Sequence, residues 1–161
     1  MIFLGIDPGS LVTGWGIVEE QGSRLRHIDN GLIQTTPGSS FAQRLDTIHG
    51  GLVQVIALHA PDEAACERIF YSKNVQSAFK LGEARGVAVL AAAQAGLEVF
   101  EYTPAEVKKA LVGYGRAEKR QVARMVTSLL SLPGEPAEDA ADALAVAICH
   151  INSRKLKSLG R

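Results

Sequence analysis

The sequence has little of what several protein classes require. It contains only two cysteines, Cys66 and Cys149, which are far apart and lack the spacing of a zinc site or a redox pair. No apolar run reaches the roughly 18 residues of a membrane helix. The N-terminal segment MIFLGIDPGS lacks the basic start and small-residue cleavage site of a signal peptide. We therefore expect a cytoplasmic protein with no membrane partner, in which both cysteines are buried and reduced.

Net charge is also absent, because 17 basic residues balance 17 acidic ones. The chain as a whole therefore has no general attraction to nucleic acid. The distribution is uneven, however: between Thr103 and Leu132, six basic residues against two acids leave an excess of four positive charges. If these side chains share one surface, they form the basic patch that is typical of nucleic-acid binding.

The hydrophobic pattern predicts one α/β domain over residues 1–152, followed by a basic, frayed tail at residues 153–161. A chain of 161 residues, 47% of them hydrophobic, is long enough for one core. We expect strands at 3–6, 14–18, 25–35, 63–70 and 96–102, and helices at 41–59, 75–95, 103–113, 116–132 and 138–152. Three leading strands suggest an antiparallel meander, and the later alternation suggests parallel additions, so a mixed sheet with helices on its faces is expected.

Four carboxylates stand apart from ordinary surface acids. Asp7 ends the first predicted strand, and Glu67 lies within the apolar run of the fourth. Asp139 and Asp142 open the last helix at i, i+3 spacing, so their side chains share one face. Clustered carboxylates repel one another unless a multivalent cation neutralises them. Oxygen ligands without histidine or cysteine companions favour Mg²⁺ or Mn²⁺ over zinc.

Each of these acids also has a plainer interpretation. Asp7 precedes a Pro-Gly pair and is compatible with a turn residue. Glu67 is compatible with an edge-strand charge in solvent, and Asp139 and Asp142 with acids that complement a helix dipole. Spacing alone does not bring the three segments together, so the residues by themselves leave both interpretations open.

Five stretches, in order, resemble the RuvC family of bacterial Holliday junction resolvases over essentially the whole chain. They are GIDPGSLVTGWGIV, ERIFYSKN, SAFKLGEARGVAVLAAA, EYTPAEVKKALVGYGRAEKRQV and DAADALAVAICH. The resemblance implies a ribonuclease H-like fold, a five-stranded mixed sheet flanked by helices on both faces. It also implies a homodimer that resolves four-way DNA junctions by paired symmetrical nicks with 5′-phosphate ends, alongside the RuvA and RuvB branch-migration complex. Two Mg²⁺ ions per active site, replaceable by Mn²⁺, would activate water and stabilise the departing 3′ oxygen.

The resemblance also implies roles for individual residues. The family's four catalytic and metal-binding acids fall on Asp7, Glu67, Asp139 and Asp142. The expected DNA-contact residues are Phe70, Tyr71, Lys73, Lys108 and Lys119. Tyr71 is also compatible with a core position, and His150, two turns beyond the acids on the last helix, is assigned a structural role. Glu83 and Phe79 depart from the family's more frequent glutamine and leucine, which affects the expected dimer or DNA contacts and not the acids.

Three rival functions are weighed against this one. An actin-like sugar kinase or ATPase also carries an aspartate before a glycine turn, but it needs two such domains and this chain is less than half that size. A catalytically silent DNA-binding module is favoured by loss of one of the four acids, and all four are present. YqgF-type resolvases share the fold and the first acid, but the DAADALA helix is not expected in them in this form.

Overall fold

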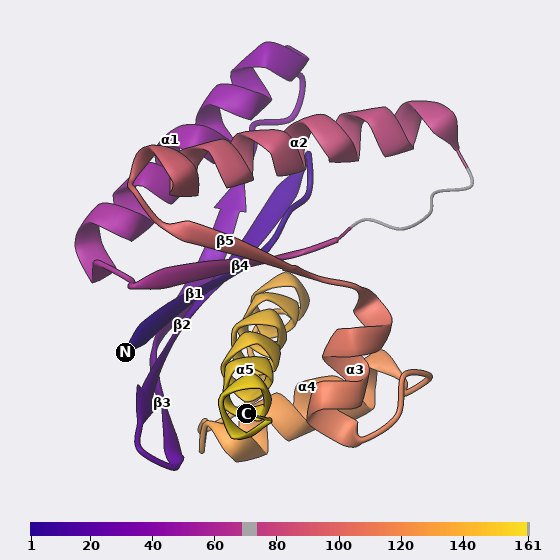
Figure 1. The fold of residues 1–161 in the computed structure, drawn as a ribbon. Helices are drawn as coiled ribbons and strands as arrows, with labels where there is room; N and C mark the ends of the chain where they lie inside the picture. The colour runs from indigo at the N-terminus through magenta and orange to yellow at the C-terminus, as the bar shows by residue number, and fades with distance from the viewer. Residues whose placement is uncertain (69–73, 161) are drawn as a thin grey trace.

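A five-stranded mixed sheet separates two layers of helices (Figure 1). The computed structural model describes residues 1–68 and 74–160. The strands are β1 (Ile2–Asp7), β2 (Val12–Gln21), β3 (Arg24–Gln34), β4 (Glu63–Glu67) and β5 (Glu98–Tyr102). The helices are α1 (Phe41–His59), α2 (Val75–Gln94), α3 (Pro104–Val112), α4 (Lys119–Leu129) and α5 (Glu138–Leu159). The strand order is β3-β2-β1-β4-β5, antiparallel among the first three strands and parallel for β1 with β4 and β4 with β5, so the predicted meander and parallel additions are confirmed.

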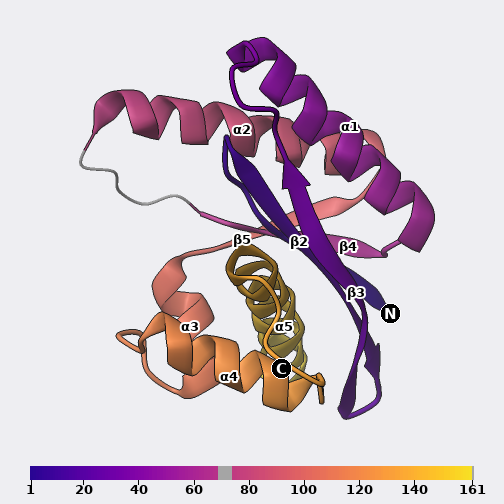
Figure 2. The ribbon, with the colours of Figure 1, turned by 180° about the vertical axis from the view of Figure 1, so that it is seen from behind.

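Helices α1 and α2 cover one face of the sheet, and α3, α4 and α5 cover the other (Figures 1 and 2). The alternation of strand residues explains the two cores, because successive side chains point to opposite faces. In β1, Leu4 and Ile6 join the core beneath α1 and α2, whereas Phe3 joins the core beneath α5. Gly5 and Asp7 share the face of Phe3, so the strand directs Asp7 toward α5.

Helix α5 lies across the middle of the sheet and is buried along most of its length, with nearly every residue from Ala140 to Ile151 in the core. Two glycines beneath it allow the close approach. A Cβ on Gly14 would overlap the carbonyl of Asp139, and a Cβ on Gly5 would overlap the carbonyl of Ala143. We call Gly5 and Gly14 the glycine seat of α5, because their missing side chains leave room for its backbone.

Two helices begin at the caps that the sequence indicates. Ser40 caps α1 and forms a capping box with Gln43. Thr103 caps α3 in the same way with Glu106, and α3 ends at Gly113, which adopts a left-handed φ of 90°. Both buried cysteines are unpaired, as expected.

The predicted bounds of α4 are wrong at both ends. The helix begins at Lys119 and not at Arg116, because Glu118 takes the capping position and its backbone N–H donates to Gln121 Oε1 at 2.9 Å. It ends at Leu129, since Ser131 has a positive φ of 50° that an α-helix does not accommodate.

The predicted end of α5 near Asn152 is also wrong, because the helix continues to Leu159. Residues 153–159, expected to fray, are helical, and two of their cations hold this end to the sheet. Lys155 Nζ lies 3.1 Å from Glu20 Oε1 and Arg154 Nε lies 3.0 Å from Glu63 Oε2. Strand β4 ends at Glu67, earlier than expected, and residues 69–73 lie outside the described part of the chain. Within residues 1–68 and 74–160, no helix has the length and hydrophobicity to cross a bilayer.

Candidate active site

Three of the four singled-out acids converge where β1 ends and α5 begins. Asp7 is the last residue of β1, and Asp139 and Asp142 lie in the first turns of α5. One carboxylate oxygen from each of the three lies within 4.8 Å of the others. Two oxygens on opposite sides of one Mg²⁺ are about 4.2 Å apart, twice the Mg–O bond length. The three side chains are therefore spaced closely enough to share a divalent cation.

Glu67 approaches the same place from the neighbouring strand. It is the last residue of β4, and the parallel register that pairs Ile6 with Cys66 brings the next residues, Asp7 and Glu67, side by side. Glu67 lines a cavity of about 200 Å³ together with Asp7 and Asp142, although it lies outside the tighter group of three acids. The fold therefore brings together all three segments that carry the predicted acids.

Burial and mutual repulsion shift the pKa values of these carboxyls. Burial is the largest cause, and with the charges of Glu67 and Asp142 it raises the pKa of Asp7 to about 8. Burial and the charge of Asp142 raise the pKa of Glu67. Burial also raises the pKa of Asp142, while the ammonium of Lys119 opposes the shift. Such a site favours the binding of positive charge, and its all-oxygen donor set fits Mg²⁺ or Mn²⁺.

Two lysines reach the acids from α3 and α4. Lys119 Nζ lies 2.9 Å from Glu138 Oε1 and 3.2 Å from Asp142 Oδ2, and the hydrogen bond to Glu138 raises the pKa of Lys119. Lys108 lines the same cavity from α3. Sequence reasoning missed Glu138, for which the available signal was its place directly before Asp139 at the start of a helix.

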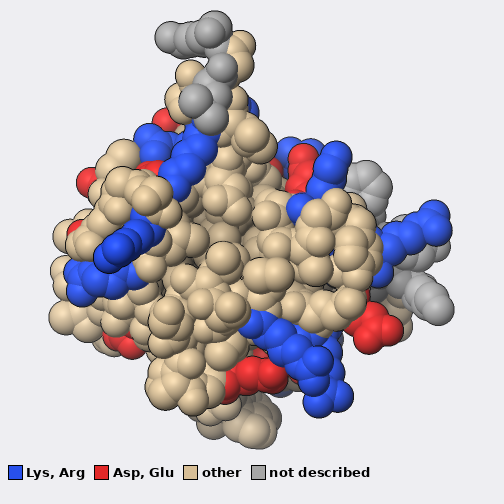
Figure 3. Space-filling view, turned by 90° about the horizontal axis from the view of Figure 1, so that it is seen from below, with Lys and Arg blue, Asp and Glu red and all other residues tan. Residues whose placement is uncertain are grey.

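The other predicted DNA-contact residues, Phe70, Tyr71 and Lys73, lie outside the described residues, in the segment between β4 and α2. The basic patch expected between Thr103 and Leu132 is not continuous on the face that Figure 3 shows, where lysines and arginines gather in separate groups with acids beside them. At the acidic cavity, positive charge comes from Lys108 and Lys119.

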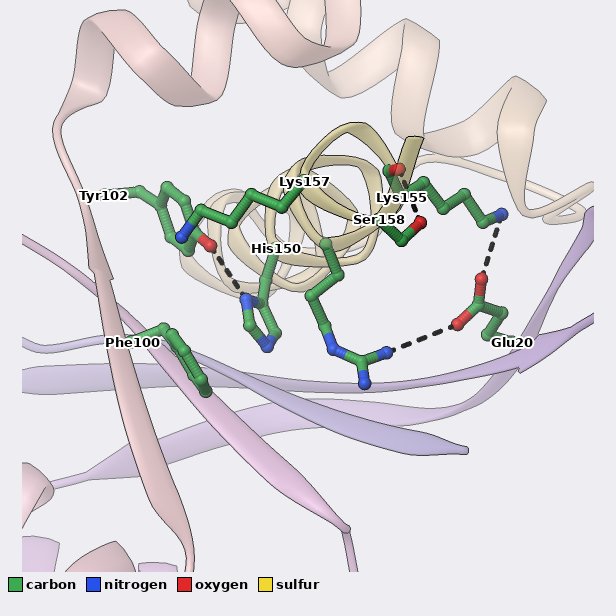
Figure 4. Close-up of a pocket in the computed structure, with 8 residues that line it drawn as sticks. Glu20, Phe100, Tyr102, His150, Lys155, Lys157 and Ser158 are labelled. Atoms are coloured by element: carbon green, nitrogen blue, oxygen red, sulfur yellow. Dashed lines mark hydrogen bonds and ion pairs between the residues drawn. The ribbon is translucent and has the colours of Figure 1, made fainter. Parts of the chain in front are cut away.

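His150 lies far from the acids, beside a second cavity of about 380 Å³ (Figure 4). Its ring is fully buried, and Nδ1 and Nε2 lie 2.8 Å from the hydroxyl of Tyr102 and from Glu63 Oε2 respectively. The ring also stacks on Phe100, with centroids 4.3 Å apart. Burial lowers the pKa of His150. These contacts join α5 to β4 and β5, and carboxylates from Glu20 and Glu63 neutralise the nearby cations of the helix.

Comparisons with known proteins agree on one family. The model of the family described as Crossover junction endodeoxyribonuclease RuvC matches residues 3–150. The crossover junction endodeoxyribonuclease RuvC of Pelobacter propionicus is 57% identical over 156 residues, which are 97% of this chain and 89% of the relative. That of Syntrophotalea carbinolica is 57% identical over 159 residues, 99% of each chain. A solved structure, T. thermophilus RuvC in complex with Holliday junction substrate, matches with a TM-score of 0.92 and 34% identity over 98% of this chain and 97% of that one. The expected ribonuclease H-like fold is confirmed by this match.

Proposed function

The chain belongs to the RuvC family, and we propose on that premise that it is a crossover junction endodeoxyribonuclease that resolves four-way DNA junctions. The observation that carries the proposal is the convergence of Asp7, Asp139 and Asp142 at one edge of the sheet, with Glu67 lining the same cavity. Paired symmetrical nicks with 5′-phosphate ends would release two duplexes that a ligase can seal. We extend the proposal to the RuvA and RuvB branch-migration complex as partners that deliver the junction.

Asp7, Glu67, Asp139 and Asp142 would hold the divalent cations, Mg²⁺ or in its place Mn²⁺, two per site. When bound, the ions would supply an activated water for in-line attack on phosphorus and stabilise the departing 3′ oxygen. The protein supplies the charge and the rigidity. Strand ends fix Asp7 and Glu67, while α5 fixes the other pair through its burial against the sheet. Rigidity matters because in-line attack tolerates little displacement of the reacting groups.

Lys108 and Lys119 are proposed to bind the DNA backbone beside the scissile phosphate. Both line the acidic cavity, so their charges lie where a phosphate must enter. The ammonium of Lys119 is shared between Glu138 and Asp142, which holds it beside the acids. Phe70, Tyr71 and Lys73 remain proposed DNA contacts, the aromatic rings by stacking on unpaired bases at the junction centre.

Helix α2 carries an exposed apolar stripe that we propose as the homodimer interface. Val75, Phe79 and Leu90 are 69%, 66% and 49% exposed. Gly82 and Gly86 lie between them, and a Cβ on either would meet no atom within 4 Å. The spacing places all five residues on one face of the helix. Two α2 helices could approach closely at the glycines, and a two-fold dimer would present two active sites for paired nicks.

Gly86→Glu is expected to convert the dimer into a monomer, because a two-fold interface would place the new charge against its own copy. Sedimentation velocity measures the change. Gly50→Glu on α1 is the matched control, since a Cβ at Gly50 also meets open space and that helix lies outside the proposed interface. A monomeric wild type, or a dimeric Gly86→Glu, would contradict the proposed interface.

Removal of metal tests the function itself. The wild type is expected to cut a synthetic four-way junction at symmetrically paired sites with Mg²⁺, to stop in excess EDTA, and to resume when Mn²⁺ is added. A linear duplex of the same sequence should stay intact. Denaturing gels of labelled strands map the cuts, and sealing by ligase reports the 5′ phosphates. Failure to cut any of several junction sequences, or undiminished cutting in EDTA, would sink the proposal.

A further inference from the structure

Glu101 connects three elements on the sheet face opposite the acids. It lies on β5 next to Tyr102, whose ring packs toward α5, so alternation directs Glu101 toward α2. Its Oε2 lies 3.2 Å from Arg68 Nε, and its Oε1 pairs with the guanidinium of Arg85 on α2. Arg68 directly follows Glu67, so this carboxylate acts one residue away from a predicted metal ligand.

The end of β4 depends on this contact. Within the described part of the chain, the Glu67 side chain has no hydrogen-bond or ion-pair partner, so the backbone of β4 sets its direction. The backbone N–H of Arg68 donates to the carbonyl of Tyr102 on β5 at 2.7 Å. The Arg68 side chain pairs with Glu101, which is also on β5. Two bonds to β5 therefore hold the residue that follows Glu67 and limit fraying of the strand at that point.

Arg85 extends the contact to α2. Its side chain is 22% exposed, and its Nε is buried without a hydrogen-bond partner among the described residues. The carboxylate of Glu101 therefore stabilises a partly buried guanidinium on α2, which would lose its ion-pair partner if Glu101 were neutralised. Glu101 thus links α2, the proposed dimer helix, to the strand end that carries Glu67. Its loss would leave the guanidinium groups of Arg68 and Arg85 without the charge between them.

We propose that Glu101 is a positioning residue for the metal site: by holding Arg68 and Arg85, its carboxylate fixes the strand end that aims Glu67 into the acidic cavity. The proposal rests on the assignment of Glu67 as a metal ligand. Glu101 itself lies on the far face of the sheet and acts through the backbone. Its removal therefore lowers metal affinity and leaves DNA binding unchanged.

Glu101→Gln is expected to weaken Mn²⁺ binding to the DNA-free protein severalfold, less than the roughly 10–100-fold lost when a group bonded directly to a metal ligand is removed. Isothermal titration calorimetry measures the affinity. The Mg²⁺ concentration for half-maximal junction cleavage should rise by a similar factor, with junction affinity in EDTA unchanged. Glu101→Asp keeps the charge and should recover part of the loss. Glu98→Gln, the same change at an exposed position of β5 without a side-chain partner in the described residues, should bind Mn²⁺ like the wild type.

Arg68→Gln is the second variant, for use if Glu101→Gln does not fold. It removes one of the two ion pairs of Glu101, and the Arg68 side chain is 53% exposed, so the protein should tolerate the change. It should weaken Mn²⁺ binding severalfold. Wild-type Mn²⁺ affinity in a folded Glu101→Gln or in Arg68→Gln would overturn the proposal, as would wild-type affinity in Glu67→Gln. The titration contains no DNA, so it tests the positioning role apart from the proposed function. If the Mn²⁺ affinities of the wild type and the variants followed the expected order but the wild type cut no junction, only the proposed function would be refuted.

Discussion

Asp7→Asn should abolish junction cleavage and leave junction binding intact. Asparagine keeps the shape of the side chain, but it removes a carboxylate on which the charges of Glu67, Asp142 and Asp139 all act. We expect the single-turnover rate to fall at least about 10³-fold, which corresponds to about 4 kcal/mol of lost transition-state stabilisation. Labelled four-way junctions report the rate, and gel-shift titration in EDTA reports binding. Cleavage by the variant within tenfold of the wild-type rate would exclude Asp7 as a metal ligand.

The free energy of unfolding of Asp7→Asn shows whether a loss of cleavage comes from lost chemistry or from lost folding. The pKa of Asp7 is raised from 3.8 to about 8 in the folded protein. Between these pH values the folded state holds a proton that the unfolded chain has released, so stability without metal falls as pH rises across this window. Asparagine does not titrate, so in EDTA at pH 8 the variant should be more stable than the wild type, by an amount on the order of a few kcal/mol.

Denaturant unfolding at pH 5 and pH 8 in EDTA measures this difference, which should be about a third as large at the lower pH. Saturating Mg²⁺ should reverse the order at pH 8, since the cation binds the folded wild type. Asp46→Asn, an exposed acid on α1, serves as the control and should follow the wild type. A variant that is less stable than the wild type at pH 8 in EDTA would show that burial and the neighbouring carboxylates do not raise the pKa of Asp7.

Gly14→Ala should damage both stability and cleavage through the glycine seat. The added Cβ would overlap the backbone carbonyl of Asp139, which has no rotamer to escape into, so α5 and the sheet must move apart. Such overpacking costs about 1–3 kcal/mol or more. A displacement of about 1 Å at the acids would lower cleavage on the order of 10²-fold. Urea unfolding and single-turnover cleavage under folding conditions measure the two effects.

Gly50→Ala provides the comparison for this change. Gly50 lies on α1, where a Cβ meets open space, so alanine there should leave cleavage unchanged and slightly stabilise the helix. If Gly14→Ala kept both the stability and the activity of the wild type, the packing of α5 directly on β2 would be refuted.

Local signals in the sequence were sufficient for most of the fold. The starts of α1 and α3 fall within one residue of those expected, because the bonds that cap them at Ser40 and Thr103 join residues only three positions apart. The end of α5 was missed for the opposite reason, since the cations of its last turns pair with Glu20 and Glu63 from distant strands. A window of sequence that contains only the basic residues suggests a frayed tail.

The candidate site likewise combines features that are visible in short stretches of sequence with features that arise only from contacts between distant elements. Asp7 and Glu67 were conspicuous as carboxylates within apolar runs, but only the parallel register of β1 and β4 brings them side by side. Glu138 and Glu101 passed as ordinary surface acids because their cationic partners come from other elements. Gly14 marked only the start of a predicted strand in the sequence, whereas its role is to leave space for the backbone of a helix that comes much later in the chain.

During synthesis, Gly5 and Gly14 of the glycine seat are made well before α5, the helix that packs on them. Strands β1 and β2 leave the ribosome before α5, which follows all the other strands and helices of the described chain. Until α5 emerges, the nascent chain carries Asp7 and Glu67 without Asp139 and Asp142, and Gly5 and Gly14 have no helix to pack against. Contacts between elements so far apart in sequence also form slowly. An unfinished chain therefore lacks two of the four clustered acids until α5 has been made and packed on the sheet.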